Sequence, residues 1–394
     1  MPSLFSLISL FTLTLHTKTY PMISNEALNC VALAMMFANR SRQLLELYHR
    51  VGSATAIVEH SSNLQAIAPD LNPQAFLIDE KELTESLDRA AREVEFAAKH
   101  GIEILTPDNN AYPKQLLEVC VDAPLALYHK GNTNLNPTHS LAIVGTRTCT
   151  EYGRDMVENI ISELARYFPD LLIVSGLAYG IDINAHRTAL DNNLPTIALL
   201  AHGLDKIYPS VHRNTAQRMV EQGGLLTEYP SFTKMEPPYF LQRNRLIAGI
   251  AEATLVVESK ERGGALTTAH YANEYNLTTM ACPGRASDPA SVGCNRLIAT
   301  NRAALVTSAA DIVRTLGWKV PKEKVQALPS LFDDDLTTEE RMVLNALKTE
   351  PTHLSALLVN TGLSAPTVMA ALSELEFRDI VRQLPGTQWR KVTK

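Results

Sequence analysis

Glycines and arginines that could bind phosphate follow several apolar segments in the middle of the chain. Gly145 and Arg147 come after the first of these segments, and Ser175, Gly176 and Gly180 come after the second. Glycine lets backbone N–H groups approach an anion closely, and the arginine guanidinium offers forked donors that match phosphate oxygens. This pattern predicts a binding site for phosphate groups.

Similar residues recur further along the chain. The later candidates for the phosphate site are Arg213, Arg243, Asn244, Arg245, Gly264 and Thr267. Arg243 and Arg245 are two residues apart and so do not share one helix face, which means that one could bind ligand while the other braces the domain. Helix N-termini after Gly180 and Gly264 would add partial positive charge. Several such strand ends along one sheet suit a chain of phosphates better than a single mononucleotide.

Each candidate also has a simpler explanation. A glycine at the end of a strand is often only a turn residue, and a single arginine on a helix is often solvated or salt-bridged. His186, His202 and His212 lie near the same strand ends but lack the spacing of metal ligands. We therefore expect these histidines to support the ligand-binding residues or to have structural roles, and we expect neither a metal nor a cofactor.

The elements that must position these residues are short apolar runs that alternate with helical periods between residues 102 and 318. The runs are residues 141–145, 171–176, 196–201, 224–229, 253–259 and 278–284. Continuous apolar strands separated by helices are typical of a parallel sheet that is covered on both faces. The sequence therefore predicts an α/β, Rossmann-like, doubly wound and mainly parallel sheet, in which ligands bind at the carboxyl ends of the strands.

The predicted domain plan places smaller units on both sides of this sheet. We expect a disordered tail or start-site extension at 1–23, a helical SAM-like or helix-hairpin-helix domain at 24–85, the Rossmann-like domain at 86–320, a linker at 321–335 and a winged-helix domain at 336–394. The apolar start of the chain is too short to span a bilayer and has no early positive charge, so a weak export signal is the minor alternative. The helical domain, with its turn at Gly52, could contact the DNA backbone or serve only packing.

Composition limits the possible partners and the compartment. The chain has 394 residues and a net charge of −6, with 45% hydrophobic and 20% charged residues, which is the balance of an ordinary globular protein. This charge argues against histone-like coating of nucleic acid but leaves a local basic groove open. Five widely spaced cysteines without a C-x-x-C pair argue against disulfides or zinc. We expect a cytoplasmic protein with no membrane partner.

A transcription factor is the first alternative class, because residues 353–361 and 365–377 have the pattern of a helix-turn-helix and residues 380–384 and 388–392 that of a wing. The second helix carries Glu374 and Glu376 and no lysine or arginine. A helix that reads the major groove needs basic and amide side chains. A protein-contact or dimer-support role fits this helix better, although Arg378, Arg382, Arg390 and Lys391 leave a basic wing open.

Seven segments of the chain match, in order, the motifs of the DprA/Smf family of DNA-processing proteins. They are AIVGTRTCTEYG, VSGLAYGIDINAH, TIALLAHGLDKIYPSVHR, LLTEYP, RNRLIAG, VVESKERGGALTTAHYANEY and CPGRASDPASVGCNRLI. The resemblance is close over about residues 100–318 and loose over the flanking domains. It implies a non-enzymatic core that binds single-stranded DNA, forms a homodimer, protects incoming DNA and passes it to the RecA recombinase during natural transformation.

The same resemblance implies which residues form the DNA pocket. The matching positions are Arg147, Ser175, Gly176, Gly180, Arg213, Arg243 and Arg245. The chain departs from the family pattern in three places. Arg213 stands where many members have lysine, His202 where many have a small residue, and Gly263-Gly264-Ala265 where Ser-Gly-Ser is common. The last difference removes a hydroxyl group that could contact DNA.

An enzyme is the main rival, since related Rossmann-like phosphoribohydrolases also carry a Gly-Gly motif after a strand. Their pattern, Gly-Gly-x-Gly-Thr-x-x-Glu, ends in a catalytic carboxylate, whereas His270 occupies that position here. A Walker loop and a G-x-G-x-x-G dinucleotide motif are both missing from the sequence. We therefore expect no enzymatic activity.

Overall fold

The computed structural model describes residues 24–38, 40–70, 72, 76–320, 336–347, 351–378, 380–384 and 386–391. The predicted tail at 1–23 and the predicted linker at 321–335 lie outside these residues. The chain divides into two compact units, Met1–Pro321 and Lys322–Lys394. Each unit is described by itself.

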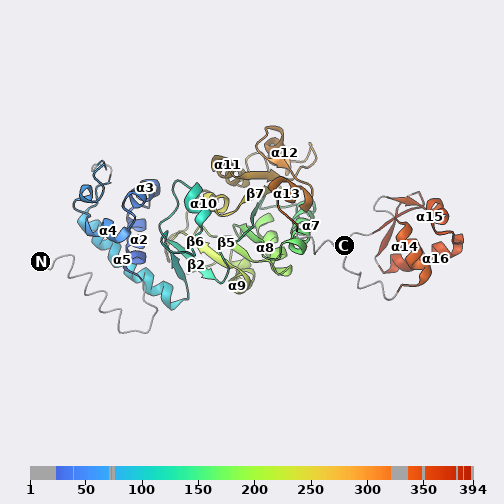
Figure 1. The fold of residues 1–394 in the computed structure, drawn as a ribbon, viewed down its shortest axis with the longest axis horizontal. Coiled ribbons are helices and arrows are strands. Elements are labelled where there is room, and N and C mark those ends of the chain that lie inside the picture. The colour runs from blue at the N-terminus through green and yellow to red at the C-terminus, as the bar shows by residue number, and fades with distance from the viewer. Residues whose placement is uncertain are drawn as a thin grey trace. The chain divides into compact units, whose positions relative to one another are not determined.

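Within the described residues, the first unit is built on a nine-stranded sheet with the order β1-β2-β6-β5-β4-β3-β7-β8-β9 (Figure 1). The strands are β1 (Glu103–Leu105), β2 (Leu127–Gly131), β3 (Ser140–Val144), β4 (Leu172–Ser175), β5 (Thr196–Leu199), β6 (Gly224–Thr227), β7 (Ala253–Val256), β8 (Thr278–Ala281) and β9 (Ala304–Leu305). The strands β6-β5-β4-β3-β7-β8-β9 run parallel to one another. At one end of the sheet, β2 pairs antiparallel with β6, and β1 pairs antiparallel with β2. The predicted doubly wound sheet is confirmed, and the six predicted strands are β3 to β8.

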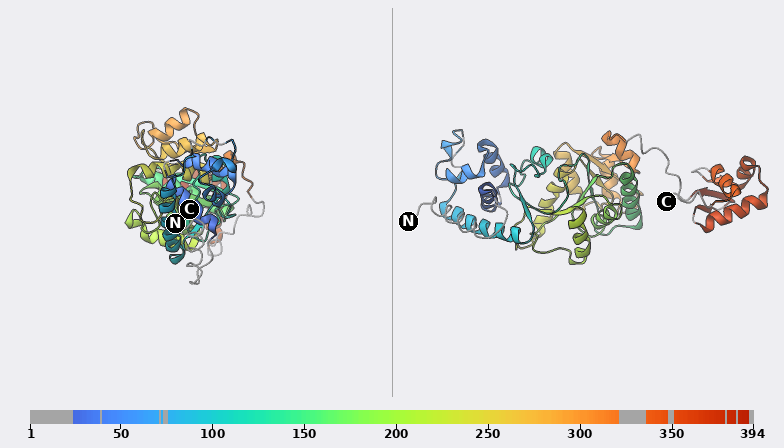
Figure 2. Two further views of the ribbon diagram at one scale, coloured as in Figure 1. Left: turned by 90° about the vertical axis from the view of Figure 1, so that its left-hand side faces the viewer. Right: turned by 60° about the horizontal axis from the view of Figure 1, so that its bottom comes forward.

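Helices cover both faces of the sheet (Figures 1 and 2). One face carries α7 (Glu151–Tyr167), α8 (Ile181–Asp191), α9 (Arg213–Gln222) and α13 (Ala309–Leu316). The other carries α6 (Lys114–Val119), α10 (Pro237–Ile250), α11 (Ala265–Glu274) and α12 (Val292–Ala299). Side chains alternate between the faces, so Leu141 and Ile143 of β3 pack on one side and Ala142 and Val144 on the other. This burial on both faces explains the continuous apolar runs.

The helical part that precedes the sheet comprises α2 (Asn25–Met36), α3 (Ser41–Val51), α4 (Ala54–Glu59) and α5 (Glu80–Lys99). The predicted domain boundary at residue 85 is wrong, because it falls inside α5. The side chain of Asp79 caps the start of this helix, and the apolar stripe of the helix continues through Val94 and Ala97. The helix packs against α2 and reaches strand β2 through Tyr128, so it joins the helical part to the sheet.

The turn at Gly52 between α3 and α4 is present, with the glycine at φ 80°. The carboxylate of Glu26 accepts hydrogen bonds from the backbone N–H groups of Ala54 and Thr55 at the start of α4. Burial raises the pKa of Glu26, but hydrogen bonds from Thr55, Ala54 and Ser53 outweigh it and leave the pKa below its usual value. An internal carboxylate therefore occupies the donors that would meet a DNA phosphate, which favours the packing role for this turn.

The second unit is a winged-helix fold, as predicted. Its elements are α14 (Thr338–Ala346), β10 (Thr352–His353), α15 (Leu354–Thr361), α16 (Ala365–Phe377), β11 (Val381–Leu384) and β12 (Gln388–Lys391), with the sheet order β10-β12-β11. Leu357, Leu372 and Trp389 lie in its core. Over the part of the chain that the structure describes, no single helix is long and apolar enough to cross a membrane. Only the bent pair Leu354–Thr361 and Ala365–Glu376 meets that test when its helices are combined.

Candidate nucleic-acid interface

The loops at the carboxyl ends of β3 and β4 meet in the middle of the sheet. Strand β3 lies between β4 and β7, so the loop that follows it stands where the strand order reverses. The N–H of Ile181 donates to the carbonyl of Thr146 (3.2 Å), and a side chain at Gly180 (φ 76°) would collide with the backbone of Thr146 and Arg147. Similarly, a side chain at Gly145 would collide with Ile181. These two glycines are therefore required for the close contact of the loops.

The side chain of Arg243 links the carboxyl ends of β4 and β5 through hydrogen bonds. Its side chain, on α10, is buried and donates to the carbonyls of Gly176 (2.9 Å) and Leu199. A side chain at Gly176 would occupy the space of this guanidinium. Burial lowers the pKa of Arg243 to about 10, with nearby Asp182 opposing the shift, so the guanidinium remains charged at neutral pH. Burial also raises the pKa of Asp182, with Arg243 opposing the shift.

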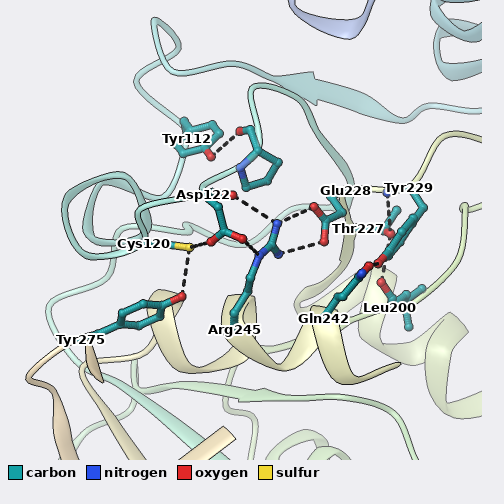
Figure 3. Close-up of polar contacts among 11 residues, drawn as sticks. Tyr112, Cys120, Asp122, Leu200, Thr227, Glu228, Tyr229, Gln242, Arg245 and Tyr275 are labelled. Atoms are coloured by element: carbon teal, nitrogen blue, oxygen red, sulfur yellow. Dashed lines mark hydrogen bonds and ion pairs between the residues drawn. The ribbon is translucent and has the colours of Figure 1, made fainter. Parts of the chain in front are cut away.

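The side chain of Arg245 lies in a buried ion-pair cluster with Asp122 and Glu228 (Figure 3). Its Nε lies 2.8 Å from Oδ2 of Asp122, and its Nη2 lies 2.7 Å from Oε2 of Glu228, with a second contact from Nη1 to Glu228 Oε1 at 2.9 Å. Only 7% of the Arg245 side chain is exposed. It therefore braces α10 against the segment before β2 and the end of β6, and the expected contact of Arg245 with DNA is corrected to a structural role.

Three other predicted residues are buried or half-buried. Ser175 is fully buried and its hydroxyl donates to the carbonyl of Ile143 (2.6 Å), which links β4 to β3. Asn244 is buried and its amide donates to the carbonyl of Gly264 (3.3 Å), which links α10 to the start of α11. Thr267 is half-buried one turn into that helix. Ser175 and Asn244, like Gly176 and Arg243, thus shape the interface from inside and do not form its outer surface.

Two of the predicted arginines are exposed and can meet a ligand. Arg147 follows β3, and its Cζ lies 5.8 Å from the ring centre of Phe240 on α10. The charge of Arg147 is near enough to contribute to the lowered pKa of Arg243. Arg213 is exposed at the first turn of α9. Together with the exposed Gly264, these arginines are the predicted residues that remain open to solvent at the carboxyl edge of the sheet.

Aromatic rings beside these arginines were not predicted. Phe240 contacts the ring of Tyr208 edge-on at 5.8 Å, and Tyr179 contacts His212 at 5.0 Å. Tyr179 and Tyr208 are 48% and 44% exposed, which leaves ring surface for a stacking partner. The sequence positions of these three aromatic residues could have indicated them, because each lies within three residues of a motif glycine, proline or arginine. We call Arg147, Arg213, Tyr179, Tyr208 and Phe240 the sheet-edge site.

Two histidines hold the loop after β4. Leu177, in the left-handed conformation (φ 57°), donates its N–H to Nε2 of His186 (3.3 Å), and its carbonyl lies 2.8 Å from Nδ1 of His212. Burial, with smaller effects from His212 and Arg243, lowers the pKa of His186 to about 3, so this ring is neutral at neutral pH. Because His212 directly precedes Arg213, this clamp couples the loop that carries Tyr179 to the start of α9.

The carboxyl edge of the sheet thus combines an exposed arginine at the switch point, a second arginine at a helix start and aromatic rings on α10 and on the loops after β4 and β5. This combination defines a Rossmann-like protein with exposed arginines at the carboxyl edge of its sheet. In the described residues no group of three or more histidine, cysteine, aspartate or glutamate side chains is arranged to hold a metal ion.

The chain belongs to the DprA/Smf family of DNA-processing proteins. The family model for DNA recombination-mediator protein A matches residues 103–317, and that for the DprA winged-helix domain matches residues 327–387. The chain is 37% identical to the DNA processing protein DprA of Streptococcus pneumoniae over 242 residues (61% of this chain, 82% of the relative). It is 33% identical to the protein Smf of Synechocystis over 323 residues (73% and 80%).

The fold agrees with a solved structure of the same family. The X-ray structure of DprA from Streptococcus pneumoniae superposes with a TM-score of 0.57 at 30% sequence identity. The match covers 71% of this chain and 97% of that chain.

Proposed function

We propose that the protein binds single-stranded DNA at the sheet-edge site without chemically altering it. The observation that carries this proposal is the placement of exposed Arg147 beside the ring of Phe240 at the point where the strand order reverses. Arginine can bind phosphate, and an aromatic ring can stack on a base. Stacking of this kind needs bases whose faces are free, and the bases of a duplex already stack on one another. These properties favour a single strand over a duplex.

A gel-shift assay with oligothymidine and with a duplex of equal length tests this proposal. We expect the single strand to bind more tightly, with little preference among base sequences, because the arginines of the site are directed at phosphate. The affinity should fall as the salt concentration rises. A preference for the duplex, or binding that salt does not change, would contradict the proposal.

The proposed cellular role is to protect incoming DNA and to help load the RecA recombinase during natural transformation, with the protein acting as a cytoplasmic homodimer. This part of the proposal rests on the family to which the chain belongs. Sedimentation of the full chain should give twice the monomer mass. Strand-exchange assays should show faster RecA filament formation on DNA coated with a second single-strand binder. A purely monomeric protein, or an unchanged rate of filament formation, would exclude the corresponding role.

The rival function is hydrolysis of nucleoside monophosphates. The position of the rival's catalytic carboxylate is held by His270, which lies on the exposed side of α11 and pairs with Glu274 at 3.3 Å. We therefore propose that the protein is not an enzyme of this kind. Incubation with AMP should release no adenine above the blank, and measurable release that a His270→Ala change does not affect would point to another catalytic group.

A further inference from the structure

An exposed phenylalanine is held in a defined position on the loop that follows β6. Phe232 is 72% exposed and adopts φ 62°, a conformation that is rare for a bulky side chain. Its N–H donates to Oδ1 of Asp205 (2.9 Å). The preceding residue, Ser231, donates its N–H (2.8 Å) and its hydroxyl to the carboxylate of Glu93 on α5. The loop is thus fixed from two sides while the ring of Phe232 faces solvent.

The ring of Phe232 continues an aromatic and basic face of α5. Phe96 contacts Phe232 edge-on, with ring centres 5.2 Å apart, and His100 stacks on Phe96 at 4.1 Å. Arg89 and Arg92 precede Phe96 by seven and four residues, a spacing that places them on the same helix face. Both arginines are exposed, and neither forms an ion pair with another described residue. We call Arg89, Arg92, Phe96, His100 and Phe232 the α5 strip.

One loop connects this strip to the sheet-edge site. The loop after β5 carries Asp205, which holds the N–H of Phe232, and three residues later it carries Tyr208. The ring of Tyr208 contacts Phe240, which in turn lies under Arg147. Lys206 of the same loop donates to the carbonyl of Thr233 (2.9 Å), next to Phe232. Both surfaces therefore border the same short loop.

We propose that the α5 strip is a second contact surface for single-stranded DNA, so that a strand leaving the sheet-edge site crosses the loop after β5 and continues along α5. The inference rests on the proposed single-strand binding. Phe232 and Phe96 offer ring surfaces for stacking, and Arg89 and Arg92 offer donors for phosphate. The carboxylate of Glu93, which shares this helix face, is buried and bonded to Ser231, so it does not repel the strand. The helical part of the chain thus contributes to DNA binding through α5.

The test compares oligothymidines of increasing length, from about 6 to about 30 nucleotides, on the full chain, because a short strand fills only one site of this kind. Phe232→Ala should leave the affinity for the shortest bound strand unchanged and weaken the longest by roughly 10- to 100-fold, the usual effect of losing a stacked base. Phe232→Tyr should retain the parent affinity at every length, because it keeps the ring. Leu77→Ala is the matched control, since Leu77 is 70% exposed outside the strip.

A second variant tests the charged part of the strip. The double change of Arg89 and Arg92 to alanine should reduce the salt dependence of long-strand binding by about two phosphate contacts and leave that of short strands unchanged. Parent affinity of Phe232→Ala at all lengths would overturn the α5 strip and leave the sheet-edge site intact. Equal losses of affinity for short and long strands in Phe232→Ala would also overturn the α5 strip, because Phe232 would then act on the sheet-edge site through the loop. Failure of the parent to bind any strand would refute the proposed function itself.

Discussion

Replacing Arg147 with alanine tests the sheet-edge site at its centre. Arg147 is exposed, forms no ion pair with another described residue, and lies beside Phe240 at the point where the strand order reverses. A hydrogen bond to a charged group contributes about 1.5–3 kcal/mol, so we expect single-strand affinity to fall by roughly 10- to 150-fold. The loss should be the same for all base sequences, and the salt dependence should decrease by about one phosphate contact.

The structure also predicts how this change affects stability. If Arg147 braced its loop through Asp182, the alanine variant would melt at a lower temperature. Asp182 instead lies beside buried Arg243, and the charge of Arg147 lowers the pKa of Arg243. Removing Arg147 therefore removes a repulsion between like charges, and the melting temperature should stay the same or rise slightly.

Two further variants complete this experiment. Arg147→Lys should restore only part of the affinity, because lysine keeps the charge but not the forked donors. Arg166→Ala, an exposed arginine at the far end of α7, is the control and should bind DNA like the parent. An Arg147→Ala protein that melts like the parent and binds oligothymidine equally well would remove Arg147 from the site. A large drop in melting temperature would show instead that Arg147 is a brace.

Three other predictions follow from the described contacts. Arg245→Met should lower the free energy of unfolding in urea by about 3–5 kcal/mol, because Asp122 and Glu228 would lose their partner; a loss near zero would show that water solvates both carboxylates. Removing residues 336–394 should leave oligothymidine affinity largely intact, and loss of most of it in a folded protein would make the winged helix a DNA-binding unit. The pKa of Glu26 is lowered in the folded state, so its carboxylate should stabilise the fold above pH 4.5. This stabilisation should be lost as the pH falls towards the pKa of Glu26 in the folded protein. Glu26→Gln should remove this pH dependence from the melting temperature.

The sheet could be predicted because burial on both faces leaves continuous apolar runs in the sequence. Strands β1, β9 and β10 escaped this reasoning since they have only three, two and two residues, too few to show a pattern. The boundary at residue 85 failed for another reason. Helix α5 serves both the helical part and the sheet, and a composition change along the chain does not reveal a helix that is shared by two packing partners.

The residue types of the site could be predicted, but the sequence did not show which of these residues face a ligand and which support the fold. Spacing showed that Arg243 and Arg245 face different ways, yet the role of Arg245 depends on Asp122, which is 123 residues away in sequence. Likewise, Arg243 has a structural role because its guanidinium donates hydrogen bonds to the carbonyls of Gly176 and Leu199, which lie at the ends of two neighbouring strands. Such partners meet only through the topology of the sheet.

The net charge of −6 leaves DNA binding open, because several carboxylates near the proposed surfaces are already engaged within the protein. Glu228 pairs with Arg245, Glu93 accepts two hydrogen bonds from Ser231, and Asp182 lies beside Arg243. Each of these acids is buried or nearly so and stabilises an element that carries the site, whereas Arg147 and the arginines of the α5 strip face water without an ion-pair partner in the described chain. A strand of phosphates responds to the local field of these exposed groups, so an acidic protein can present a basic path.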